Sequence, residues 1–138
     1  MKELDAKTIQ KYKGRSVAWL LKKAQEYFNK FIRLRDEGKQ CISCDSYNIA
    51  HASHFYSAGH YPTMRFNEMN CHASCLRCNN FLHGNLNEYR KRITSRIGED
   101  GLKELDMLAG SDKRNNHKWN RLELIYILET YKSKVKAH

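Results

Sequence analysis

The hydrophobic residues that follow Ser16 recur at the spacing of an amphipathic α-helix. Residues 17–34 place their apolar side chains on one face, and Ser16 and Gly38 are suited to begin and end such a helix. That face is formed by Val17, Leu20, Leu21, Ala24, Tyr27, Phe28, Phe31 and Leu34. The face is wide for so short a chain, so it either packs on other helices of the same chain or joins two copies of the protein.

Three further helices are predicted in the second half of the chain. Apolar positions share one face over residues 86–97, and Gly98 can end that helix. Residues 102–108 suggest a short helix, and a final one begins near residue 122 and runs into a lysine-rich end.

Residues 39–84 differ from the segments on both sides. They contain all five cysteines and five of the seven histidines, and no helical period survives there. Short strands are expected at residues 49–55 and 64–66. Because this segment has few aliphatic residues, it needs a metal ion to hold its fold.

A chain of 138 residues with 41% hydrophobic residues is long enough for one domain with a modest core. We expect an α+β protein, mainly helical, in which helices flank a small zinc-stapled centre. Residues 1–15 are polar and basic and are predicted to be an N-terminal arm. Residues 16–138 are predicted to form a single domain.

The net charge of +10 favours a polyanionic partner, and nucleic acid is the usual one, although basic charge can also serve solubility alone. No apolar run approaches the roughly 20 residues that a membrane span needs. The first residues, Met1–Asp5, lead into no apolar stretch, so no signal peptide is expected. We therefore expect a cytoplasmic protein with no membrane partner.

Two C-x2-C pairs predict a structural zinc site. The pairs are Cys41 with Cys44 and Cys75 with Cys78. A gap of two residues lets both thiolates of a turn reach one tetrahedral ion, at about 2.3 Å each. Four thiolates leave no open coordination position, so this Zn²⁺ would stabilise the fold rather than perform chemistry. The fifth cysteine, Cys71, is expected to be a small buried side chain.

Polar residues that could perform chemistry gather around the two pairs. They are His51, His54, His60, Asn70, His72, Asn79, Asn80 and His83. A single histidine is more often structural than catalytic. If a helix starts at the second cysteine pair, however, Asn79 and His83 share a face and could hold one ion.

The order His54, Asn70, Cys75-x2-Cys78, Asn79 resembles the HNH, or ββα-metal, nuclease motif built on a treble-clef zinc knuckle. The chain resembles more closely the NinG/Rap recombination-protein family of lambdoid phages. The stretches that carry this likeness are Ala52–His60, Met64–Phe66, Asn70–Asn79, Gly84–Asn85 and Tyr89–Arg90. The resemblance implies a structure-selective endonuclease that cuts branched recombination intermediates such as Holliday junctions and D-loops.

The resemblance also implies a role for each matching residue. His54 would be the general base that takes a proton from the attacking water, and Asn70 would orient its ring through a hydrogen bond. Asn79 would bind a catalytic Mg²⁺ or Mn²⁺, with His83 as a second ligand. The products would carry 5′-phosphate and 3′-hydroxyl ends.

One position departs from the motif. Many HNH enzymes have an aspartate before the base histidine, and this chain has Ser53 there. A hard ion such as Mg²⁺ prefers carboxylate oxygens. The site would therefore recruit a carboxylate from elsewhere, or use His51 or His83 with a softer ion such as Mn²⁺.

Basic and aromatic residues near the motif are candidates for DNA contact. The loop of residues 55–66 contains Tyr56, His60 and Arg65, which could stack on unpaired bases and hold phosphates. A loop that packs its own aromatic residues is an equal alternative. The following helix carries further basic residues, for which a solvated face is the alternative: Arg90, Lys91, Arg92 and Arg96.

Three functions remain open from the sequence. The first is the branched-DNA endonuclease, the second a non-catalytic zinc-dependent DNA-binding module, and the third an HNH nuclease for ordinary duplex DNA. His54, Asn70 and Asn79 favour the two nucleases, and only the family likeness favours the first. We expect branched DNA as the partner, a homodimer that supplies two cutting sites, and host or phage recombination proteins as further partners.

Overall fold

The structure is a computed structural model that describes residues 4–138, except the side chains of residues 113–115. It divides into two compact units, and one boundary between them falls within the helix of residues 17–35. The terminal unit contains residues 4–31 and 118–138, and the central unit contains residues 32–117. Whether residues 16–138 form one domain, as the sequence predicts, stays a prediction.

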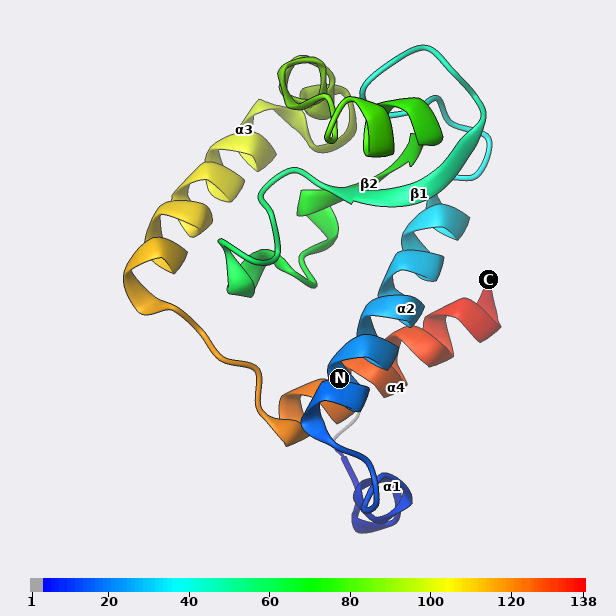
Figure 1. Cartoon of the computed structure of the whole chain (residues 1–138), viewed down its shortest axis with the longest axis vertical. Coiled ribbons are helices and arrows are strands. Elements are labelled where there is room, and N and C mark those ends of the chain that lie inside the picture. Colours follow the sequence, from blue (N-terminus) through cyan, green and yellow to red (C-terminus); the bar gives the residue numbers. More distant parts are fainter. Residues whose placement is uncertain (1–3) are drawn as a thin grey trace. The chain divides into compact units, whose positions relative to one another are not determined.

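The terminal unit is built on α2 (Val17–Arg35) and α4 (Arg121–Ala137), which lie side by side in Figure 1. The Ser16 hydroxyl accepts a hydrogen bond from the backbone of Trp19 at 3.0 Å, as expected of an N-cap. Phe28 is fully buried, and its ring meets that of Tyr131 edge-on with a centroid distance of 4.8 Å. The apolar face of the first long helix therefore packs within one chain, the first of the two alternatives.

The basic N-terminal segment contains a helix of its own, α1 (Ala6–Lys11), capped by Asp5. Tyr12 follows it and is buried, with its hydroxyl 2.5 Å from a carboxylate oxygen of Glu129 on α4. Arg121 donates to the carbonyl of Tyr12 at 3.2 Å. The described part of the predicted arm is therefore attached to α4, and residues 1–3 lie outside the described residues.

The central unit contains the sheet, in which β1 (Ile49–His54) runs antiparallel to β2 (Cys71–Cys75). The register places His54 opposite Cys71, with an irregularity near the start of β1. The strand predicted at residues 49–55 is confirmed. The strand predicted at residues 64–66 is wrong, because Pro62 begins the 3-10 helix η1 (Pro62–Met64).

The second half of the central unit is α3 (Leu86–Asn115), which bends at Gly98, where φ is 75° and ψ is 170°. The two helices predicted on either side of this glycine are therefore present, and the second continues to Asn115. The 3-10 helix η2 (Glu68–Asn70) lies directly before β2, and the π-helix η3 (Arg77–Phe81) lies between β2 and α3.

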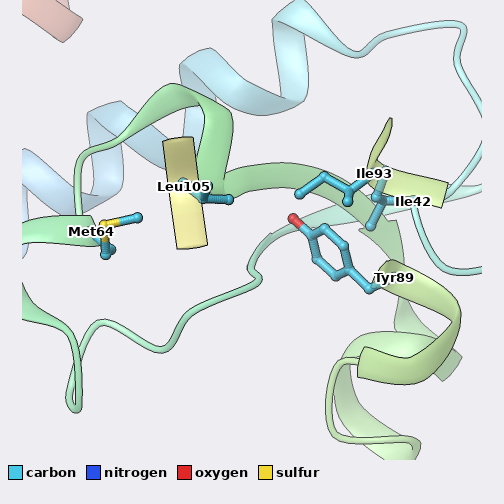
Figure 2. Close-up of a cluster of buried hydrophobic side chains, with 5 residues drawn as sticks. All are labelled: Ile42, Met64, Tyr89, Ile93 and Leu105. Atoms are coloured by element: carbon cyan, nitrogen blue, oxygen red, sulfur yellow. The ribbon is translucent and has the colours of Figure 1, made fainter. Parts of the chain in front are cut away.

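The core of the central unit joins three segments that are distant in sequence. Figure 2 shows its five buried side chains, which are Ile42, Met64, Tyr89, Ile93 and Leu105. Two of these residues lie on α3 before its bend and one after it. The core therefore fixes the cysteine turn and the loop that follows β1 against α3. In residues 4–138, no helix is long and apolar enough to cross a membrane.

Candidate metal centre and active site

The two cysteine pairs meet at one point of the central unit. One Sγ atom from each of Cys41, Cys44, Cys75 and Cys78 lies within 4.8 Å of all the others. The Sγ atoms of Cys44 and Cys75 are 3.6 Å apart. Thiolates at about 2.3 Å around a tetrahedral ion are about 3.8 Å from each other, so the cluster has the dimensions of a zinc site.

Hydrogen bonds to sulfur add a second layer around this cluster. Backbone N–H groups donate to Cys41 Sγ and to Cys75 Sγ, each at 3.4 Å. The side chain of Asn85 donates to Cys78 Sγ at 3.6 Å. Burial raises the pKa of Cys75, but the N–H of Cys78 and the nearby thiols outweigh it and lower that pKa to about 7. Burial raises the pKa of Cys44, and it raises that of Cys78 to about 12. The donor set and its surroundings therefore fit a thiolate-bound metal such as zinc.

Cys71 takes no part in this cluster. It is fully buried at the start of β2, opposite His54, and burial raises the pKa of its thiol well above the usual range. The expectation of a small buried side chain is confirmed. Its neighbour His72 is also structural: its Nδ1 lies 3.1 Å from the hydroxyl of Tyr89, and that hydroxyl donates to the Ser53 carbonyl.

His54 ends β1 with its ring held by the backbone of the following loop. Its Nε2 atom lies 2.8 Å from the carbonyl oxygen of Arg65. A carbonyl only accepts, so Nε2 carries the proton and the lone pair of the neutral ring is on Nδ1. Burial lowers the pKa of His54 below its ordinary 6.5, against the opposing effect of that carbonyl, and the charge of Arg65 lowers it further. The ring is therefore neutral at neutral pH and has the tautomer of a proton acceptor.

Asn70 supports His54 differently from the expectation. Its amide oxygen accepts from the backbone N–H of Tyr56 at 2.8 Å. Its amide nitrogen donates to the carbonyls of Tyr56 at 2.9 Å and Met64 at 3.1 Å. These three hydrogen bonds reach backbone groups at the two ends of one loop, and the direct bond predicted to the His54 ring is not among them. Asn70 fixes the loop, and the loop supplies the Arg65 carbonyl.

Asn79 lies against the residue that replaces the motif aspartate. The Ser53 hydroxyl donates to Asn79 Oδ1 at 2.7 Å and is 2.5 Å from the hydroxyl of Ser74 on β2. The Asn79 amide nitrogen donates to the side chain of Asn80 at 3.1 Å. The structure therefore brings Ser53 and Asn79 together.

A helix does start at the second cysteine pair, but it ends before His83, so Asn79 and His83 do not share one helical face. That they hold one ion stays a prediction. The π-helix η3 ends at Phe81, and residues 83–85 then adopt three consecutive left-handed conformations, with φ of 49°, 88° and 48°. His83 therefore lies beyond the end of the helix, where it lines a cavity together with His54. Asn79 is not among the residues that line this cavity.

This cavity has a volume of about 450 Å³ and opens to solvent beside His54. Its walls come from the loop after β1 and from the start of α3. The lining residues are His54, Phe55, Tyr56, Ser57, Tyr61, His83, Leu86, Asn87 and Arg90. It therefore joins an imidazole base, aromatic rings and a guanidinium group in one place.

The other predicted DNA contacts are held within the central unit to different degrees. Arg90 pairs with Asp106 at 2.7 Å, and the same carboxylate accepts the hydroxyl of Tyr56. Lys91 is exposed and lies 3.1 Å from Glu88.

Two further arginines and one histidine belong to this set. Arg92 pairs with the exposed Asp45 at 2.9 Å. Arg96 donates to the carbonyl of Gln40 at 2.7 Å and is mostly buried, so its guanidinium supports the fold. Its contact with DNA stays a prediction. His60 is exposed in the loop, with its Nδ1 2.9 Å from the Ser57 hydroxyl.

Three residues that sequence reasoning missed support the site. Ser74 holds Ser53, Tyr89 joins Ser53 to His72, and Asp106 fixes both Tyr56 and Arg90. Ser74 lies on β2, which was not predicted, and Tyr89 lies on the apolar face of a predicted helix, where a polar atom gives no periodic signal. Asp106 lies on a charged helix and could not be distinguished from its acidic neighbours.

Comparison with known sequences decides the family. The family model described as "Bacteriophage Lambda NinG protein" matches residues 1–138. The chain belongs to the NinG family. The predicted membership is therefore confirmed. "Protein ninG" of Escherichia phage lambda is 35% identical over 134 residues, which cover 96% of this chain and 63% of that relative. "Protein ninG" of Salmonella phage P22 is 34% identical over 134 residues, with coverages of 96% and 64%.

The match covers slightly less than two thirds of these NinG relatives' own length. Another relative, "Protein ninG" of Escherichia phage 933W, shows the same coverage at 34% identity. No solved structure matches the chain. Family membership is thus shown by sequence.

Proposed function

We propose that this NinG-family chain is a metal-dependent endonuclease that cuts branched DNA, with His54 as the general base. The observation that carries the proposal is the ring of His54, whose Nε2 is bonded to the Arg65 carbonyl beside an open cavity. This bond selects the tautomer whose Nδ1 accepts a proton. The lowered pKa keeps that nitrogen unprotonated at neutral pH.

The arrangement of elements supports an HNH-like centre on a treble-clef knuckle. β1 carries His54, β2 leads into the second cysteine pair, and η3 follows directly with Asn79. In this reading one structural Zn²⁺ on the four thiolates joins the end of β2 to the turn at Cys41. The zinc holds the motif residues in place and performs no chemistry, because four protein ligands complete its coordination.

The reaction follows from the position of His54. Its Nδ1 takes a proton from a water molecule, and the water oxygen attacks the scissile phosphorus. The bond from phosphorus to the 3′ oxygen breaks, and that oxygen receives a proton from solvent. The products carry a 5′-phosphate and a 3′-hydroxyl, and a general base of this kind contributes about 10²–10⁴-fold to the rate.

A catalytic divalent ion would neutralise charge on the phosphate and stabilise the leaving oxygen. The Asn79 amide oxygen fits a hard ion, and His83 fits a softer one. Among the residues that the structure describes, the four cysteines are the one group of three or more His, Cys, Asp or Glu residues close enough for a metal. With no carboxylate cluster at His54, we favour Mn²⁺ over Mg²⁺ there, with DNA and water completing its ligands.

The cavity beside His54 supports nucleic acid as the substrate. Tyr56 and Tyr61 contribute aromatic rings, 4.9 Å between centroids, and Arg90 lies 5.6 Å from the ring centre of Phe55. Aromatic rings accept unstacked bases, and a guanidinium beside them suits a phosphate. Unpaired or strained bases occur at branch points, so this lining favours branched over continuous duplex DNA.

A four-way junction has two equivalent strands to cut, and one chain has one candidate base. We therefore propose that two copies act on each junction about a two-fold axis. The buried face of α2 is used within the chain, so the contact between copies would lie elsewhere. Recombination proteins of the host or phage remain proposed partners.

The experiment compares nicking of a four-way junction and an equal-length duplex, with Mg²⁺, with Mn²⁺ and without added metal. The proposal predicts metal-dependent cutting that is faster on the junction, with 3′-hydroxyl ends that a polymerase can extend. Equal cutting of both substrates would favour the duplex nuclease. Binding without any cutting would favour the non-catalytic DNA-binding module. The lack of a carboxylate cluster beside His54 among the described residues also suits that module. A complex whose mass corresponds to one chain on each junction would refute only the proposed dimer.

A further inference from the structure

The positive charge of the chain is concentrated in the terminal unit. Residues 1–31 and 118–138 contain thirteen of the 25 Lys and Arg residues and five of the 15 Asp and Glu residues. That leaves twelve basic and ten acidic residues in residues 32–117. The 52 residues outside the candidate active site therefore carry +8 of the net charge of +10, and nothing in the proposed chemistry uses them.

Part of this charge surrounds a groove of about 290 Å³ between the N-terminal segment, α2 and α4. All of its lining residues belong to the terminal unit. They are Lys11, Tyr12, Arg15, Trp19, Lys23, Tyr27, Leu128 and Lys132. Four cationic side chains thus alternate with three aromatic ones, and the lining includes no acidic residue.

The aromatic rings of the groove are arranged for stacking. Trp19 and Tyr27 are half-buried and lie two turns apart on one face of α2, with Lys23 between them. The Arg15 guanidinium lies 4.4 Å from the centre of the Trp19 ring, and the Lys23 ammonium lies 5.9 Å from it. A guanidinium on a ring keeps its N–H groups at its edge, where they can donate to a phosphate.

The cations differ in how far other residues neutralise them. Lys11 is 3.2 Å from Glu129, and Lys23 is 3.1 Å from Glu26. In residues 4–138, with 113–115 set aside, Arg15 and Lys132 show no ion pair with a carboxylate. Among the described residues, Arg15 and Lys132 are thus the two groove cations outside any ion pair, although the charge of Lys132 also acts on Glu129.

We propose that this groove, made of terminal-unit residues, binds an unpaired DNA strand at a site additional to the cavity beside His54. Phosphates would contact Arg15 and Lys132, and a base would stack on Trp19 or Tyr27. Identifying the polyanion as DNA rests on the proposed function. A fully basic lining alone suits any polyanion, but planar rings between the cations suit a chain that alternates phosphates with flat bases.

The test measures binding of a fluorescent oligothymidine to full-length protein carrying His54→Ala, by anisotropy over a salt series. Arg15→Glu with Lys132→Glu should weaken binding about tenfold or more. It should also lower the slope of log affinity against log salt by about 1.4, or about 0.7 for each lost phosphate contact. The matched control is Lys39→Glu with Lys103→Glu, which makes the same change of net charge at two exposed positions of the central unit.

Trp19 supplies a second measurement that does not depend on net charge. The chain has two tryptophans, so Trp119→Phe leaves Trp19 as the single reporter, and oligothymidine should quench its fluorescence by stacking. Trp19→Ala should weaken binding about fivefold or more, with Trp19→Phe restoring most of it. Thermal unfolding of each variant checks that the terminal unit is intact.

Equal weakening by the two charge-reversal pairs would overturn the inference, because binding would then follow net charge alone. Unquenched Trp19 fluorescence, or competition by polyglutamate as strong as by oligothymidine, would also overturn it. Failure of the inference and of the proposed function can be told apart. If the wild-type chain cuts junctions and the groove substitutions leave oligothymidine binding unchanged, only the inference is refuted. If binding depends on the groove and no junction is cut, only the nuclease proposal is refuted.

Discussion

Replacing Asn70 by alanine tests how the loop after β1 holds the candidate base. Asn70 is fully buried, and its amide makes three hydrogen bonds to the backbone of Tyr56 and Met64. The Met64 carbonyl also accepts from Asn67 at 3.3 Å, so it keeps a partner when Asn70 is removed. The Tyr56 N–H loses the acceptor that Asn70 provides, and this unpaired donor makes the largest single contribution to the loss of folding free energy.

The magnitude follows from these partners. A buried donor left without an acceptor costs about 1–3 kcal/mol, and each of the two weakened carbonyls adds about 0.5–1 kcal/mol. We expect Asn70→Ala to lower the free energy of unfolding by about 3 kcal/mol. A domain of ordinary stability, about 5–15 kcal/mol, stays folded at that cost. The loop would then no longer hold the Arg65 carbonyl against His54, and cleavage should fall about 100-fold, at the lower end of the effect of a general base.

Two assays separate positioning from general destabilisation. Urea unfolding gives the stability change, and NMR titration of His54 gives its pKa. In Asn70→Ala that pKa should rise toward 6.5, because the ring loses the burial that lowers it. The control is Ile93→Ala, which removes a buried core side chain of the same unit at a comparable cost and should leave the His54 pKa low. Unchanged cleavage and an unchanged His54 pKa in Asn70→Ala would refute the assignment.

Three further outcomes are expected. Elemental analysis should find one zinc per chain, and chelation should unfold the segment around residues 41–78, since a structural site contributes about 10–16 kcal/mol of apparent binding energy; folded protein without zinc would contradict this. The midpoint of the loss of cleavage with falling pH should lie below pH 6.5, because burial lowers the pKa of His54 and the ring stays neutral until the pH falls through that pKa; a midpoint above pH 6.5 would contradict that state. Gly98→Ala should cost about 1–3 kcal/mol in thermal unfolding because its φ of 75° and ψ of 170° suit glycine alone, whereas Gly110→Ala, in a regular helical turn with open space around it, should be neutral or stabilising.

The features predicted correctly from the sequence are those with a strong local signal. The helical period from Val17 gives α2 to within a residue of its end, and the paired C-x2-C spacing gives the metal cluster. These signals depend on neighbouring residues in the chain, so they survive without knowledge of tertiary contacts.

The features that were missed depend on contacts between distant segments. β2 is buried at all five positions, so it shows no alternation that could mark a strand. The π-helix η3 and the left-handed run at residues 83–85 have no hydrophobic period, so the relation of Asn79 to His83 could not be predicted. Asn70 acts through backbone groups of a loop, and backbone groups leave no trace in the residue types.

The most direct test of the nuclease assignment is single-turnover cleavage of a four-way junction by wild-type protein and by His54→Ala, with enzyme in excess and Mn²⁺ present. We expect the rate constant to fall about 10²–10⁴-fold, while the affinity measured on the same junction stays within about twofold. Cleavage by His54→Ala at the wild-type rate would contradict the assignment of the base, whatever the zinc content of the protein.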